Sequence, residues 1–160
     1  MATTPNSQIY AQTPNNGVSG VLLTTALTNT KAFDGTEAAG TAMALVYTAG
    51  ANGGRCDSLI ARLTSTAGAT ASGTTAALLV RFWMNNGSVN TTAANNKLLP
   101  FEIAIPATTV TALATAALPW YEYAMKIPAM VAGYRIYAGI TVAVGGTNCA
   151  VQVLADGGDF

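Results

Sequence analysis

The chain has 160 residues, of which 51% are hydrophobic, and its seven Lys or Arg, seven Asp or Glu and no His give a formal net charge of zero. This length is typical of one domain with a full core, and the charged fraction of 9% is far below the roughly 25% of ordinary soluble domains. Scattered basic residues argue against a nucleic-acid partner, while a low net charge favours self-association.

Residues 1–17 are predicted to form an extended N-terminal arm, separate from a single domain over residues 18–160. The arm contains Pro5 and Pro14 and has only Ile9 and Tyr10 as apolar anchors. Terminal segments with little to bury usually fray. The arm is therefore either a disordered tail or a segment ordered against a neighbouring subunit, with Ile9 and Tyr10 as the side chains to bury.

Eight segments of the domain show the two-residue alternation of β-strands, and none is a convincing helix. These segments are 18–27, 42–48, 55–65, 76–87 with its terminal turn, 97–105, 120–127, 134–144 and 149–155. The segment 76–87 has the strongest signal, with Phe82 on the face expected in the core and Arg81 and Trp83 on the face that a neighbour would cover. In segment 97–105, Pro100 cannot donate to a ladder, which predicts a sheet edge or a bulge there.

The connections alternate between short turns and long crossings. A Gly-rich stretch at 49–54 is predicted to be a hairpin turn, whereas residues 28–40, 66–75 and 106–117 are long polar or small-residue connections. Eight antiparallel strands with long crossings predict an all-β fold, an antiparallel β-sandwich of the jelly-roll type. No internal repeat of fixed period is present, which argues against a propeller or solenoid.

The sequence offers little for catalysis, so we expect no enzyme, no cofactor and no metal site. Histidine, the commonest general base and zinc ligand, is absent. Asp57, Glu102 and Glu122 occur singly on strands, which favours solvated faces or ion pairs over a glycosidase pair. Asp156 and Asp159 lack the further spaced oxygen ligands of a calcium site.

The two cysteines, Cys56 and Cys149, do not form a disulfide framework or a metal-ligand pattern. Buried free thiols are the simpler interpretation, and a bridge between them is the alternative. Three uncharged stretches approach the length of a membrane span, but Thr, Ser, Pro and Gly interrupt them, so no span is expected. The first ten residues lack the features of a secretory signal, which predicts synthesis in the cytoplasm.

Aromatic residues gather in the segment Trp120, Tyr121 and Tyr123, with Tyr134 and Tyr137 on the next predicted strand. Core and cross-strand packing explains such a cluster. The alternatives are a subunit interface, for which Trp and Tyr are common anchors, and a sugar-stacking face.

The motifs VYTAGANGGRCDSL, LLVRFWMNNG, IAIPATT, AGYRIYAGI and the C-terminal GGDF resemble small virion proteins of tailed bacteriophages, of the decoration (cement) type, over residues 41–160. The resemblance implies a jelly-roll subunit, commonly a homotrimer, on the capsid exterior, where it bridges neighbouring major capsid proteins and stabilises the shell. It carries over no binding residue. The alternatives are a receptor- or glycan-binding module of a head or tail fibre and a structural component of the tail or connector.

Overall fold

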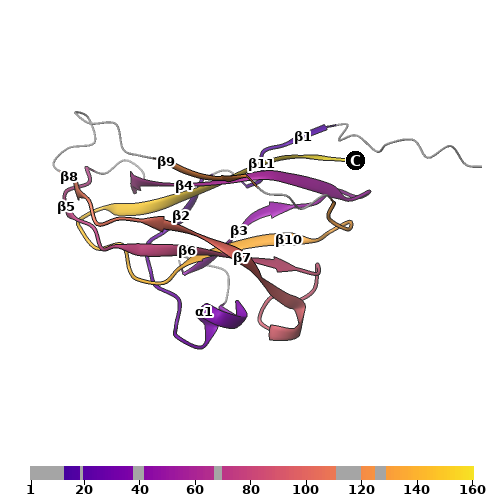
Figure 1. The fold of residues 1–160 in the computed structure, drawn as a ribbon, viewed down its shortest axis with the longest axis horizontal. Coiled ribbons are helices and arrows are strands. Elements are labelled where there is room, and N and C mark those ends of the chain that lie inside the picture. The colour runs from indigo at the N-terminus through magenta and orange to yellow at the C-terminus, as the bar shows by residue number, and fades with distance from the viewer. Residues whose placement is uncertain (1–12, 19, 38–41, 67–69, 111–119, 125–128) are drawn as a thin grey trace, which may run out of the picture.

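A computed structural model describes residues 13–18, 20–37, 42–66, 70–110, 120–124 and 129–160. Strands dominate this part of the chain and form two layers (Figure 1). Sheet A contains β1 (Thr13–Asn15), β2 (Val21–Leu23), β11 (Cys149–Asp159), β4 (Gly54–Ser65) and β9 (Trp120–Ala124). Sheet B contains β3 (Met43–Thr48), β10 (Arg135–Ile140), β6 (Leu78–Asn85) and β7 (Asn96–Ile105).

The strand pairing is nested, as in a jelly roll. Along the chain, β2 pairs with β11, β3 with β10, β4 with β9, and β6 with β7, all antiparallel. Two further antiparallel pairs, β4 with β11 and β6 with β10, join these four pairs into the two sheets. The predicted all-β sandwich with jelly-roll connectivity is therefore confirmed.

The described residues contain eleven strands, so the predicted number of eight is wrong. The eight strands of the nested pairing make up the two sheets together with β1. The additional strands are β1, which pairs with β11 beyond the end of β2, and the two-residue strands β5 (Gly73–Thr74) and β8 (Thr109–Val110), which pair with each other. Segments this short carry no readable side-chain alternation, and β1 lies within the stretch expected to be an arm.

Two connections differ from their predictions. The turn at 49–54 leads from β3 in sheet B to β4 in sheet A, so it links the two sheets and is not a hairpin. The connection at 28–40 contains a single helical turn, α1 (Lys31–Asp34), which lies outside sheet B (Figure 1). A further helical turn, η1 (Ala93–Asn95), precedes β7.

The main core lies between the sheets and contains the face of β6 that was predicted to be buried. Leu78, Val80 and Phe82 each have at most 4% of their surface exposed, and β6 is an inner strand of sheet B. The prediction for Pro100 is also confirmed. β7 is an edge strand, and its residues 99–101 together face only Phe82 of β6, which makes a bulge.

Candidate functional site

The strands β7 and β9 bring aromatic side chains to one edge of the sandwich. β9 is the last strand of sheet A, β7 is the last strand of sheet B, and the two lie near each other. Trp120 is 59% exposed and Tyr123 is 39% exposed, both on β9. We refer to Trp120, Tyr123 and Phe101 of β7 as the aromatic edge.

An aromatic stack joins this edge to the core. The rings of Tyr123 and Phe101 lie parallel, 5° apart, with centroids separated by 3.8 Å. Phe101 in turn lies 5.6 Å from the fully buried Phe82. Contacts of this kind fix ring orientation, so the exposed ring of Tyr123 rests on a rigid support.

Trp120 points away from this stack because neighbouring residues of a strand alternate between faces. Its register partner on β4 is Arg62, whose Nε donates to Oε1 of Gln152 over 2.8 Å. Trp120 therefore belongs to the outer face of sheet A, which also carries the charged side chains of Arg62 and Glu122. Tyr121, opposite the buried Ala61, faces the core and is half-buried.

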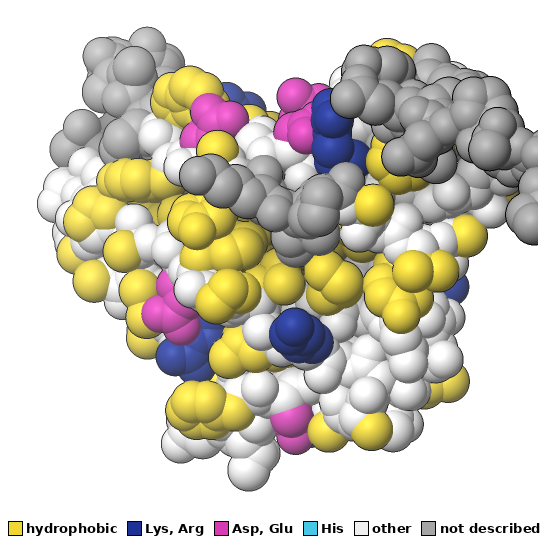
Figure 2. Space-filling view, turned by 45° about the vertical axis from the view of Figure 1, so that its right-hand side comes forward, with side chains coloured by type: hydrophobic (Ala, Val, Ile, Leu, Met, Phe, Trp, Pro, Cys, Tyr) yellow, Lys and Arg dark blue, Asp and Glu magenta, His cyan; other side chains and the backbone are white. Residues whose placement is uncertain are grey.

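Figure 2 shows that hydrophobic side chains cover much of one face of the molecule, where charged side chains occur only as small groups. Ion pairs within the chain include two that involve carboxylates considered for catalysis. Arg81 pairs with Glu102 across β6 and β7, and Arg55 pairs with Asp57 over 2.7 Å. Two of the three carboxylates considered for catalysis are therefore paired with an arginine.

The other predicted contact residues lie elsewhere. Ile9 and Tyr10 are outside the described residues. Trp83 is 0% exposed, so its predicted place on the face opposite Phe82 is correct, but the chain itself covers it and no neighbour is needed. The cover comes from the connection between β2 and β3, whose Leu27 and Ala32 pack with Trp83 in a second, smaller core. In that core the indole Nε1 of Trp83 has no hydrogen-bond partner.

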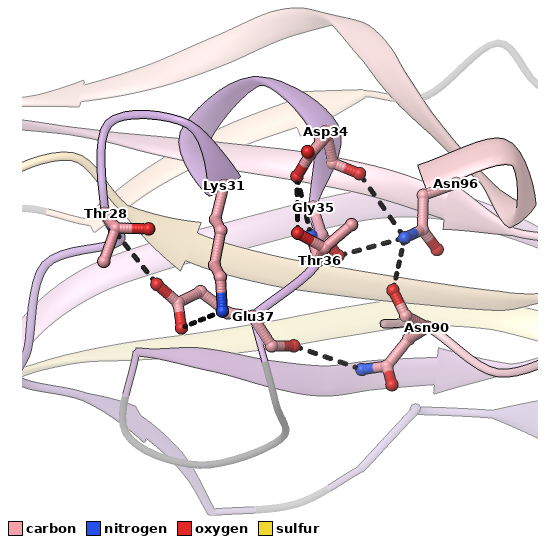
Figure 3. Close-up of polar contacts among 8 residues, drawn as sticks. All are labelled: Thr28, Lys31, Asp34, Gly35, Thr36, Glu37, Asn90 and Asn96. Carbon is pink, nitrogen blue, oxygen red and sulfur yellow. Dashed lines mark hydrogen bonds and ion pairs between the residues drawn. The ribbon is translucent and has the colours of Figure 1, made fainter. Parts of the chain in front are cut away.

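Polar contacts hold this connection on the sheet (Figure 3). Nδ2 of Asn96 lies 3.0 Å from the carbonyl oxygen of Gly35 and 2.6 Å from that of Asn90, and it donates to both. Nδ2 of Asn90 donates to the carbonyl oxygen of Glu37 over 3.5 Å. The loop that leads into β7 is thereby joined to the segment around α1. The composition of residues 88–96 predicts a loop. The distant residues that this loop contacts cannot be predicted in the same way, because they depend on the fold.

The carboxylate of Glu37 makes two contacts within the same connection between β2 and β3. It accepts from the backbone N–H of Thr28 over 3.0 Å and lies 3.7 Å from Nζ of Lys31 (Figure 3). The N–H of Thr28 holds the pKa of Glu37 below its usual value, and Lys31 adds to this effect. Both contacts are on the surface, so they fix the path of the chain more than they stabilise it.

Asp159, in the C-terminal GGDF motif, joins three segments at one end of the sandwich. Its Oδ1 accepts from the backbone N–H of Gly50 over 3.0 Å and from Nδ2 of Asn15 over 2.9 Å. The hydroxyl of Tyr47 lies 3.4 Å away, and burial followed by the nearby charge of Asp159 raises the pKa of Tyr47. These contacts give Asp159 a structural role, where the sequence raised only a weak calcium hypothesis.

Both cysteines are free and buried, as the simpler interpretation predicted. The register of β4 and β11 places Cys149 opposite Ser65 and Cys56 opposite Gly157. Nine residues of strand separate Cys56 from Ser65, about 30 Å at the usual rise. This distance excludes a bridge, since the Cα atoms of a disulfide are less than about 7 Å apart.

No group of three or more His, Cys, Asp or Glu in the described ranges is arranged to hold a metal ion. Within the same ranges, no helix has the length and apolar character needed to cross a membrane. The chain matches no protein-family model, no curated protein and no solved structure. Among the described residues, the aromatic edge combines exposed aromatic side chains with a stacked support, which are features of a contact site.

Proposed function

We propose that this protein is a structural subunit of a bacteriophage particle, which decorates the capsid and stabilises it by bridging neighbouring major capsid proteins. The jelly roll supports this role by fold-level analogy, because viral capsid domains commonly use it. The sequence motifs that resemble decoration proteins support it independently. In this proposal the subunit is a homotrimer on the outside of the capsid.

The observation that carries the proposal is the aromatic edge on a surface with few charges. Trp and Tyr are common anchors of protein interfaces, and Tyr123 is held rigidly by its 3.8 Å stack on Phe101. A rigid anchor loses little conformational freedom when it binds. The exposed Tyr123 therefore suits a contact with another protein, and the exposed Trp120 adds an aromatic side chain on the opposite face of the same strand.

The proposed mechanism is mechanical. A trimer seated between capsid proteins adds buried interface to each of them, which resists the outward pressure of packaged DNA. Many such contacts act together on one shell, so modest affinity for each copy gives a strong combined effect. The near-neutral surface allows close approach without the desolvation of many charges.

The experiment is binding of the purified protein to particles that lack it, followed by a test of their thermal stability. We expect saturable binding and a higher disruption temperature. Trp120→Ala should weaken binding about tenfold or more, as for an interface anchor. Phe33→Ala is the matched control, because Phe33 is an exposed aromatic residue on α1, outside the other sheet. Failure of the unmodified protein to bind would reject the proposal.

A second candidate is a glycan-binding module of a head or tail fibre. The exposed Trp120 and the stacked Tyr123 favour it, since aromatic faces commonly stack on sugar rings. Titration with glycans of the host surface, followed by Trp fluorescence, distinguishes it from capsid decoration. A third candidate is a tail or connector component, which would form rings of sixfold or twelvefold symmetry.

A further inference from the structure

A second apolar surface lies at one end of sheet B. It is a groove of about 440 Å³ where β6 begins and where β7 and β10 end. Its lining residues are almost all apolar: Ala77, Leu78, Leu79, Ala104, Ile105, Pro106, Thr141 and Val142. We refer to it as the sheet B groove.

Part of this groove belongs to the outer face of sheet B. Leu79 and Ala104 are register partners, and they alternate with core residues such as Val80 and Ile105, so they point away from the core. Outer faces of antiparallel sheets are usually polar. At this position the chain instead exposes Val142, at 45%, together with Ala104 and Pro106.

The charges next to the groove cancel each other. Arg81 follows Leu79 on the same face of β6, and it pairs with Glu102 of β7. The guanidinium group also lies 5.1 Å above the ring of Phe33. A partner that fills the groove therefore needs apolar side chains and no charge of its own.

The N-terminal segment of this chain has that character. Residues 1–12 contain no charged side chain, and they include Ile9 and Tyr10. Twelve residues in extended conformation span about 40 Å. The segment is therefore long enough to reach beyond the domain to which it belongs.

The register of β1 determines where this segment leaves the domain. Thr13 pairs with Asp159 and Asn15 with Gly157, so Thr13 lies beside the C-terminal end of β11. β1 and the C-terminus lie at one end of the sandwich, whereas β5 and β8, which adjoin the groove, lie at the other end (Figure 1). To fill the groove of its own domain, the segment would have to cross from the end at which Thr13 lies to the opposite end of the sandwich.

We propose that residues 1–12 of one copy bind the sheet B groove of a second copy, with Ile9 and Tyr10 in contact with Leu79 and Val142. Each copy then gives a segment at one end and receives one at the other. Such a head-to-tail contact forms a ring when its rotation closes. The contact concerns the protein alone and does not depend on the capsid role, so failure of either proposal leaves the other standing.

Site-directed crosslinking tests the contact in the full-length protein. One preparation carries Ile9→Cys and another carries Val142→Cys, and the two are mixed and oxidised with diamide. The native thiols are buried and do not compete. We expect a mixed covalent dimer. Val89→Cys is the matched control, since Val89 is also exposed, at 64%, and lies outside the groove.

A charge in the groove gives a second measurement without a new thiol. Val142→Asp should weaken self-association about tenfold or more in sedimentation velocity, because a buried unpaired charge is unfavourable. Val89→Asp should leave it unchanged. Mixed crosslinking no greater than with Val89→Cys would overturn the proposal. If a protein that carries both Ile9→Cys and Val142→Cys forms the link only within single chains, the proposal is overturned as well. A Val142→Asp variant that loses particle binding but self-associates normally would also overturn it.

Discussion

Gly35 lies against the indole of Trp83 so closely that a Cβ atom on Gly35 would be 2.7 Å from two of the ring carbons. Gly35 has a φ of 65° and ends α1, where its N–H donates to the carbonyl oxygen of Lys31. Only glycine satisfies both requirements, the left-handed backbone and the close approach. This contact explains how the chain covers Trp83 without a partner.

Gly35→Ala should therefore lower the free energy of unfolding by roughly 2–5 kcal/mol, because backbone strain and overpacking add. Chemical denaturation measures the change. Gly133→Ala separates the two causes, since Gly133 has a φ of 74° and a Cβ atom there would have no neighbour within 4 Å. The control should lose only about 1–2 kcal/mol. Equal losses in both variants would contradict close packing on Trp83.

Asn96→Ala should destabilise the chain by about 1–3 kcal/mol, because it removes the donor to the carbonyl groups of Gly35 and Asn90. Hydrogen exchange should show faster exchange around α1. Asn52→Ala is the control, since Asn52 is exposed in the turn between the sheets, and it should change stability by no more than about 0.5 kcal/mol. Unchanged exchange near α1 in Asn96→Ala would refute the anchoring role.

Asp159→Ala should also destabilise the chain, by about 1–3 kcal/mol, because it leaves the N–H of Gly50 and the amide of Asn15 without their acceptor. Thermal unfolding of this variant is best compared with that of Asp156→Ala. Asp156 is exposed on the same strand, so its removal should have little effect. If both variants unfold like the parent protein, Asp159 does not join the three segments.

Stability should fall at alkaline pH because of Cys56. Burial, and then the charges of Asp57 and Asp156, raises the pKa of this thiol to about 12, whereas an unfolded thiol titrates near 8.5. Between these values the folded state holds a proton that the unfolded state has lost, so a rise in pH favours unfolding. Denaturation between pH 9 and 11 should show a slope that Cys56→Ala reduces by up to about 1.4 kcal/mol per pH unit. An unchanged slope would contradict this.

Much of the fold was predictable because side-chain alternation is a local property. It identified the buried face of β6, while the missing N–H of Pro100 predicted the edge or bulge at that residue. Side-chain alternation predicted a strand that is too long at 134–144, because β10 ends at Ile140 and Val142 is exposed. It also missed the end of β11, because Gly157 and Gly158 read as a tail although both pair with β4.

The sites were less predictable because they depend on contacts between distant segments. The sequence favoured core and cross-strand packing for Trp120 and Tyr123, with an interface as an alternative, and both side chains are exposed. It did not show the stack on Phe101, which requires β7 and β9 to meet. The sequence correctly placed Trp83 on the face of β6 opposite to Phe82, which lies in the main core. It did not show that Gly35 covers the indole, since the residues lie 48 positions apart and Gly35 belongs to a stretch that reads as a polar loop.

The capsid role is tested most directly by the number of copies in each purified particle, measured by quantitative mass spectrometry against the major capsid protein. A trimer that occupies threefold positions across the shell predicts a copy number of the same order as that of the major capsid protein. A few copies in each particle, or a single set of six or twelve, would contradict capsid decoration and would favour a fibre or connector instead.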